Sequence, residues 1–177
     1  MPLELLAVEF RRGEEDLGRI RERTGTVTMG EKAGAKPPNF CFGCGAANSA
    51  GMHLSFSRDE AQRKVAGTLC LGERYQGAPG IVHGGIVALV LDEALSKVSK
   101  FHGVTAVTAE LIVEYLKPVR VGEEIFVEAV NERHQGRQLL HAGEIRDAKG
   151  RVLARARGRF VVVDAERFLE TNKESGQ

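Results

Sequence analysis

The strongest constraint in this 177-residue chain is an apolar stretch over residues 80–94, in which Gly84 and Gly85 precede a run of aliphatic side chains. From position 86 to position 98 the apolar residues cover most sides of a helix. A helix that is apolar nearly all round is enclosed by other structure and does not lie on a surface. The stretch therefore predicts one long central helix with the rest of the chain wrapped around it.

Two acidic residues interrupt this apolar helix. Glu93 is placed for an i,i+4 ion pair with Lys97, and we interpret it as part of the solvent face. Asp92 has no such partner, and it falls on a line of small residues along one side of the helix, where a ligand can approach it. Asp92 is therefore the candidate catalytic carboxylate.

The glycines at the start of the helix suit an oxyanion. Gly84 and Gly85 carry no side chains, so the first backbone N–H groups are left uncovered at the electropositive helix end. Gly85 and Asp92 are separated by about 10 Å along one helix, which is too far for two groups that act on adjoining atoms. A second copy of the chain could supply its own Asp92, so we expect composite sites around a two-fold axis.

The bulk composition indicates an ordinary single-domain globular protein. Charged residues make up 28% of the chain, and a formal net charge of +1 gives no electrostatic case for a nucleic-acid partner. The longest aliphatic run, residues 86–91, is far shorter than the roughly 20 residues that span a bilayer. Three cysteines cannot all pair, and the first residues do not resemble a secretion signal. We expect a cytoplasmic protein with no membrane span.

Turn residues divide the rest of the chain into strand-like segments. The central helix is expected to end near Gly103. Strands are expected over residues 52–56, 64–71, 105–116, 124–133, 138–147 and 151–163. The order of two strands, one helix and four strands predicts an α+β fold, with a curled antiparallel sheet wrapped around the helix.

Three parts are expected along the chain. Residues 1–39 form an N-terminal helical extension and an irregular connection, because apolar residues recur at helical spacing over 3–20 and glycines and prolines follow. Residues 40–164 form the main domain. Residues 165–177 form a polar tail.

The sequence Cys-Phe-Gly-Cys-Gly at residues 41–45 allows a metal or redox interpretation, because two thiolates at this spacing can ligate one zinc ion or form a disulfide. A structural zinc site has four ligands, however, and the chain offers no second Cys-x-x-Cys pair. We therefore expect Cys41 and Cys44 to serve packing and loop shape, with no metal and no cofactor.

His83-Gly84-Gly85, followed by Asp92 within Leu-Val-Leu-Asp-Glu-Ala, resembles the hotdog-fold acyl-CoA thioesterases of the phenylacetate-pathway type, in the 4-hydroxybenzoyl-CoA thioesterase superfamily. Tyr-Gln-Gly-Ala-Pro-Gly at 75–80 and Tyr-Leu-Lys-Pro-Val-Arg-Val-Gly-Glu at 115–123 add to this resemblance. It covers residues 41–163. It implies a hotdog fold, a homodimer that assembles further into a tetramer, and hydrolysis of acyl-CoA thioesters.

The resemblance also implies roles for particular residues. Backbone N–H groups at Gly84 and Gly85 would polarise the thioester carbonyl, and Asp92 of a second subunit would act as general base or as nucleophile. Thr108 matches a hydroxyl residue that orients the water, although threonine is also common in strands. His83 would position the substrate or its loop, or it would only cap the helix.

The remaining candidates concern substrate binding. Gln76 or Gly77 lies where related enzymes place a polar group near the thioester, and Gly77 departs from that pattern if the polar residue belongs there. Val82 leads into the helix. The cations near strand ends that could meet coenzyme A phosphates are Lys117, Arg120, Arg133 and Arg137.

Two other functions are possible. A hydratase or dehydratase of acyl thioesters would carry a catalytic histidine in a context such as His-Phe-Pro, which is absent because His83 is followed by two glycines. A non-catalytic acyl-CoA binding or regulatory module is the other alternative. The choice of acyl chain, and of coenzyme A against acyl carrier protein, stays open.

Overall fold

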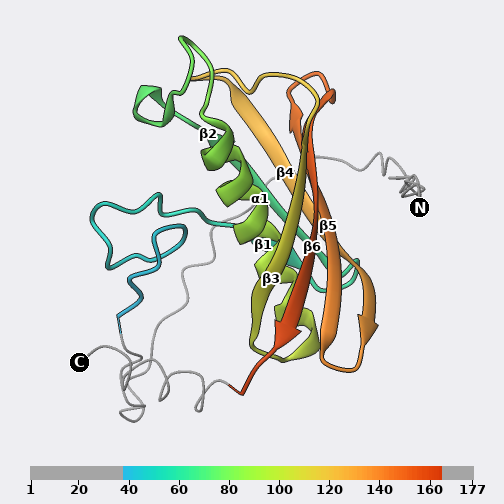
Figure 1. Ribbon diagram of the computed structural model, residues 1–177. Coiled ribbons are helices and arrows are strands. Elements are labelled where there is room, and N and C mark those ends of the chain that lie inside the picture. Colours follow the sequence, from blue (N-terminus) through green and yellow to red (C-terminus); the bar gives the residue numbers. More distant parts are fainter. Residues whose placement is uncertain (1–37, 165–177) are drawn as a thin grey trace, which may run out of the picture. The chain divides into compact units, whose positions relative to one another are not determined.

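One antiparallel sheet carries the fold in the computed structural model of the chain, which describes residues 38–164 (Figure 1). The strands of these residues are β1 (Ser57–Asp59), β2 (Lys64–Cys70), β3 (Ala106–Tyr115), β4 (Glu124–Gln135), β5 (Gln138–Asp147) and β6 (Val152–Val162). Their spatial order is β1-β2-β4-β5-β6-β3, and every neighbouring pair is antiparallel. β1 and β3 therefore form the two edges of the sheet.

The helix α1 (Gly84–Val98) lies against one face of this sheet and contacts β2, β3, β4, β5 and β6 (Figure 1). A 3₁₀ turn (Ser99–His102) continues it, and Gly103 ends it with a φ of 66°. Its fully enclosed side chains are Val87, Val90, Leu91, Ala94, Leu95 and Val98. The predicted central helix is confirmed, and so is the α+β fold with an antiparallel sheet curled around it.

The helix approaches β5 and β6 more closely than ordinary side chains would allow. A Cβ atom added at Gly143 would lie 2.7 Å from Leu95 Cδ1 and 2.8 Å from the backbone oxygen of Glu128. One added at Gly158 would lie 3.0 Å from Leu95 Cδ2. Glycine at both positions thus leaves room for the Leu95 side chain at the centre of the core.

The five predicted strands over residues 64–163 are confirmed, each within two residues of its observed ends. The first predicted strand, over residues 52–56, is wrong. Met52 and Leu54 are buried as the alternation indicated, but their N–H groups donate to the carbonyl oxygens of residues 42 and 43, at 2.8 Å each. The segment therefore pairs with the preceding loop, and His53 interrupts its extended conformation with a φ of 53°.

Two further expectations fall outside the described residues. The N-terminal helical extension and nearly all of its connection precede residue 38, and the polar tail begins at residue 165. Between residues 38 and 164, no helix has the length and apolar character that crossing a bilayer requires.

A buried histidine lies beneath the end of α1. His141 on β5 is fully enclosed, its Nε2 is 3.1 Å from Ser99 Oγ, and its ring packs against Phe160 with 5.0 Å between centroids. Burial lowers the pKa of His141 to about 4, and positive charge at His102 and His134 would add to this effect. The folded protein therefore holds this imidazole neutral over a pH range in which the unfolded chain protonates it.

We expect this imidazole to make stability fall with pH. Between about pH 6.5 and pH 4 the unfolded state binds a proton at His141 and the folded state does not, so the free energy of unfolding decreases as pH falls. The loss specific to His141 should reach about 3 kcal/mol over this range. Urea denaturation of the wild type and of His141→Gln, from pH 7 down to pH 4, measures it.

The variant should lose less stability than the wild type over this pH range, because it lacks the titrating group. Parallel curves for the wild type and His141→Gln would contradict the prediction.

Candidate active site

The start of α1 presents one uncovered backbone donor. His83 is the N-cap, and its Nδ1 accepts the N–H of Gly85 at 3.0 Å. The backbone oxygen of His83 accepts the N–H groups of Ile86 and Val87. No hydrogen bond to the N–H of Gly84 is found within residues 38–164. Of the two predicted donors, Gly85 is thus already engaged within its own chain, whereas Gly84 is available.

Three backbone and side-chain contacts hold the segment that leads into the helix. The N–H of Val82 donates to the oxygen of Val119 at 2.9 Å, which ties this segment to the chain after β3. Gln76 Oε1 accepts the N–H of Gly80 at 2.7 Å, so its amide braces the turn over residues 76–80. Gly77 packs on His83, because a Cβ added at Gly77 would lie 3.1 Å from the Cα of His83. All four predicted residues of this segment thus lie around the helix start.

Tyr115 also contacts this segment, and the sequence did not identify it as a site residue. Its hydroxyl donates to the backbone oxygen of Gly84 at 2.9 Å, from the last position of β3. Its only sequence signal is that it opens the segment 115–123, which contributes to the family resemblance.

Asp92 lies two turns further along α1, beneath β3. Thr108 Oγ1 donates to Asp92 Oδ1 at 2.8 Å, so the structure brings these two predicted residues together. The strand pairing shifts register between Thr108 and Glu110, which leaves Ala109 as a bulge beside the site. Burial raises the pKa of the Asp92 carboxyl, and the hydrogen bond from Thr108 acts in the opposite direction.

The two halves of the predicted site are separate within one chain. Gly84 and Asp92 lie on the same straight helix, eight residues apart, which corresponds to about 12 Å. A single thioester carbonyl cannot contact both groups of one chain.

The predicted cations fall at both ends of the sheet. Lys117 and Arg120 follow β3 near the helix start, where Arg120 pairs with Ile81 in an isolated bridge. Arg137 lies in the turn between β4 and β5, and its guanidinium donates to the oxygen of Val162 at the far end of β6. Arg133, on β4 close to that turn, is exposed. The structure therefore does not bring Arg137 together with Lys117 and Arg120.

The interpretation of Glu93 as a solvent-facing residue is wrong. Its ion pair with Lys97 is present at 3.2 Å, but the Glu93 side chain is only 13% exposed. It lies beneath the loop that carries Cys41 and Cys44. These cysteines are about 50 residues away in the sequence, so the sequence did not predict the contact. Glu93 does form the predicted ion pair, but the loop covers its side chain and keeps solvent away from it.

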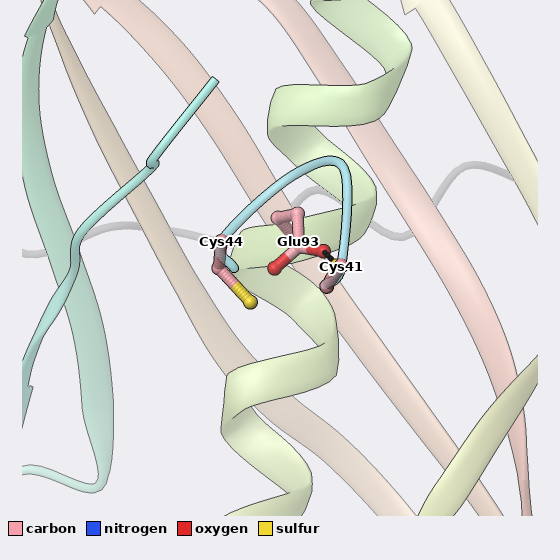
Figure 2. Close-up of side chains that lie close together, drawn as sticks. All are labelled: Cys41, Cys44 and Glu93. Carbon is pink, nitrogen blue, oxygen red and sulfur yellow. Dashed lines mark hydrogen bonds between the residues drawn. The ribbon is translucent and has the colours of Figure 1, made fainter. Parts of the chain in front are cut away.

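Glu93 and the two cysteines form a compact cluster (Figure 2). The thiol of Cys41 donates to Glu93 Oε1 at 3.2 Å, and Lys97 Nζ donates to Cys44 Sγ at 2.9 Å. Burial raises the pKa of the Cys44 thiol. Burial alone would raise the pKa of Glu93, but hydrogen bonds from both cysteines, with the charge of Lys97, hold it below its usual value.

Comparisons with known proteins support the family resemblance. Residues 79–154 match the model of the thioesterase superfamily. The chain is 30% identical over 119 residues to acyl-coenzyme A thioesterase THEM4 of Bos taurus, which covers 65% of this chain and 47% of that protein. The chain spans about half the length of the curated relatives it matches.

Solved structures show the same fold. The crystal structure of a thioesterase superfamily protein has a TM-score of 0.62 and 33% identity, over 66% of this chain and 60% of that one. An acyl-CoA hydrolase from Staphylococcus aureus has a TM-score of 0.56 and 23% identity, over 60% of this chain and 67% of that one, which shows the fold alone. Residues 79–154 are thus similar to the thioesterase superfamily, and the chain has the hotdog fold of these solved thioesterases.

Proposed function

We propose that the protein hydrolyses acyl-CoA thioesters to the free acid and coenzyme A. The observation that carries this proposal is the half-buried carboxylate of Asp92, which accepts a hydrogen bond from Thr108 on β3. Asp92 lies on the same helix whose start offers the N–H of Gly84. Such a carboxylate and such a donor are the two groups that acyl transfer to water requires. The relatives named acyl-coenzyme A thioesterases, and the Staphylococcus aureus hydrolase solved with butyryl coenzyme A, support the substrate class.

The N–H of Gly84 would donate a hydrogen bond to the thioester oxygen. At the first position of α1 this donor also benefits from the partial positive charge of the helix start. Gly85 contributes to the same electrostatic field, but its own N–H donates to His83. His83 and Tyr115 act here as positioning residues, because one caps the helix and the other holds the oxygen of Gly84.

Asp92 would act either as a general base, which activates a water molecule, or as a nucleophile, which attacks the carbonyl carbon itself. As a base, its Oδ2 takes a proton from water while the water oxygen bonds to that carbon. The tetrahedral intermediate then collapses, the carbon–sulfur bond breaks, and the thiolate of coenzyme A leaves with the electron pair and is protonated. Because Thr108 donates a hydrogen bond to Oδ1, the other carboxylate oxygen, Oδ2, would be the one that contacts the water.

The site would be completed by a second copy of the chain. β3 is an edge of the sheet, and it exposes Ile112 by 58% and Tyr115 by 55%. A long edge strand with exposed apolar side chains pairs readily with another strand. Because Asp92 lies beneath β3, pairing along this edge would bring the Asp92 of one copy toward the Gly84 of the other. We propose a homodimer on this basis, and a tetramer remains a prediction.

Coenzyme A phosphates would bind near the helix start. Lys117 and Arg120 are both exposed there, and cations at such a position attract phosphate groups. Arg137 would have to act from the opposite end of the sheet, so we do not assign it to the same phosphate group.

We expect Asp92→Asn to lower kcat by about 100-fold or more, since it removes the charge but keeps the shape of the side chain. The measurement is free-thiol release from short, medium, long and aromatic acyl-CoAs. Asp59→Asn, in a surface hairpin, is the matched control and should keep wild-type rates. Equal rates for Asp92→Asn and the wild type would remove Asp92 from the chemistry. Ligand binding without turnover in the wild type would instead indicate a binding module.

The backbone donor of Gly84 can be deleted because of its position in the helix. Gly84 is the first helical residue, where proline is tolerated, and His83 has the extended conformation that a following proline favours, with φ −60° and ψ 136°. Gly84→Pro removes the N–H and should lower kcat by about 100- to 1000-fold.

Gly84→Ala is the control for this deletion. It keeps the N–H, and its Cβ would lie in ordinary contact with Tyr115, 3.6 Å from the ring. Activity should stay within a few-fold of the wild type. Similar losses in both variants would show that the space around Gly84 matters and that its N–H does not.

Composite sites predict that two inactive variants restore each other. A mixed dimer of Asp92→Asn and Gly84→Pro chains has one site with both defects and one intact site. Random pairing after co-refolding should therefore recover about a quarter of the wild-type sites. Thiol release from the mixture measures this recovery, and mixtures of each variant with itself serve as controls. A mixture that stays as inactive as its components would place the whole site within one chain.

A further inference from the structure

We propose that Cys41, Cys44 and Glu93 form a binding site for a thiophilic divalent cation, for which zinc is the best match. This site is separate from the proposed thioesterase chemistry, because Glu93 faces the loop of residues 38–56 whereas Asp92 faces β3. It would fasten that loop to the central helix.

The ligand atoms already lie together. The sulfur atoms of Cys41 and Cys44 and a carboxylate oxygen of Glu93 are all within 4.8 Å of one another. Figure 2 shows both cysteines on the loop as it passes over α1, with the Glu93 carboxylate between them. Ligand atoms around a tetrahedral zinc ion are separated by about 3.5 to 3.8 Å, given the usual metal–ligand distances. Atoms up to 4.8 Å apart would have to approach by about 1 Å to reach that spacing.

The loop is shaped around this carboxylate. A Cβ added at Gly43 would lie 2.5 Å from Glu93 Cγ and Oε1, so a side chain at position 43 would displace Glu93. A Cβ added at Gly45 would lie 2.5 Å from the backbone nitrogen and oxygen of Cys41. The N–H of Gly45 donates to that same oxygen at 2.8 Å and closes the turn. Both glycines are therefore needed for the cysteines to face Glu93.

The donor set fits zinc chemically. Zinc binds cysteine thiolates and carboxylates, and sites with three protein ligands leave a fourth position for solvent. Cys41 is exposed, so an ion can reach the cluster from solution. Two soft sulfur ligands favour zinc over magnesium or calcium, which prefer oxygen.

Lys97 balances the charge of the site with and without the ion. Without metal, the ammonium of Lys97 faces the Glu93 carboxylate and donates to the Cys44 sulfur, while the thiols keep their protons. On binding, the two thiols lose their protons, and a zinc ion with two thiolates and one carboxylate carries a net charge of −1. The charge on Lys97 neutralises this complex, so the ion replaces two protons without a change in total charge. Its hydrogen bond to Cys44 would persist as a contact around the metal ligands.

The sequence alone did not predict this site, because it offered two thiols at metal-binding spacing and no further ligand. The fold supplies the third ligand from α1, about 50 residues away. The site therefore depends on the loop and the helix being packed together, and the unfolded chain would bind the ion more weakly.

The test is a titration of the reduced 177-residue chain with Co²⁺, followed by displacement with Zn²⁺. We expect one equivalent of cobalt to give thiolate-to-metal charge-transfer absorption and the strong visible bands of a four-coordinate site. Zinc should then protect two of the three cysteines from a thiol reagent. Cys41→Ser and Cys44→Ser should abolish the charge-transfer absorption or weaken binding by at least about 10-fold. Glu93→Gln should weaken binding by about 10- to 100-fold.

Cys70→Ser is the matched control, because Cys70 lies on β2 outside the cluster, and it should bind like the wild type. Circular dichroism of each variant excludes loss of the fold as the cause of lost binding. The proposal is overturned if the folded, reduced wild type gives no thiolate-to-cobalt absorption, if binding survives loss of both Cys41 and Cys44, or if Glu93→Gln binds with unchanged affinity. None of these results depends on thioester hydrolysis.

Discussion

Enclosure of α1 by the curled sheet is the constraint on which the rest of the structure depends. The helix has 15 residues, and without tertiary contacts a helix of this length is marginal in water. Leu91 and Leu95 are fully buried, and each such side chain contributes about 1.5 to 3 kcal/mol. The sheet needs the helix equally, since it would otherwise expose an apolar face. Gly143 and Gly158 allow the close approach that completes this core.

The two acidic residues of the enclosed helix contact different neighbouring segments. Consecutive residues point about 100° apart around a helix, so Asp92 meets Thr108 on β3 while Glu93 meets the loop of residues 38–56. The helix start, held by Tyr115 and capped by His83, leaves the N–H of Gly84 uncovered. One rigid element thus positions a candidate base, a candidate oxyanion donor and a candidate metal ligand, and their relative placement is as fixed as the helix itself.

The edge position of β3 connects this architecture to assembly. Thr108 lies on that edge strand beside the bulge at Ala109, and the outer side of the strand has no neighbour within its own sheet. The helix length keeps Gly84 about 12 Å from Asp92 in one chain. An exposed edge next to one half of a divided site is the arrangement in which a second copy completes both the sheet and the site.

The sequence by itself determined the central helix and five of the strands, and it singled out Asp92 as a candidate catalytic residue, because apolar periodicity, turn residues and a lone carboxylate are local patterns. Through a motif resemblance it also suggested Thr108 and the glycines of the helix start as candidate site residues. Only the tertiary structure decided that residues 52–56 pair with a loop, that His83 Nδ1 takes the N–H of Gly85, and that Glu93 is covered by Cys41 and Cys44. These outcomes depend on contacts between segments distant in the chain or on the orientation of a single side chain. A residue's pattern along the sequence fixes its face of a helix or strand, whereas its partner is fixed only when the elements pack.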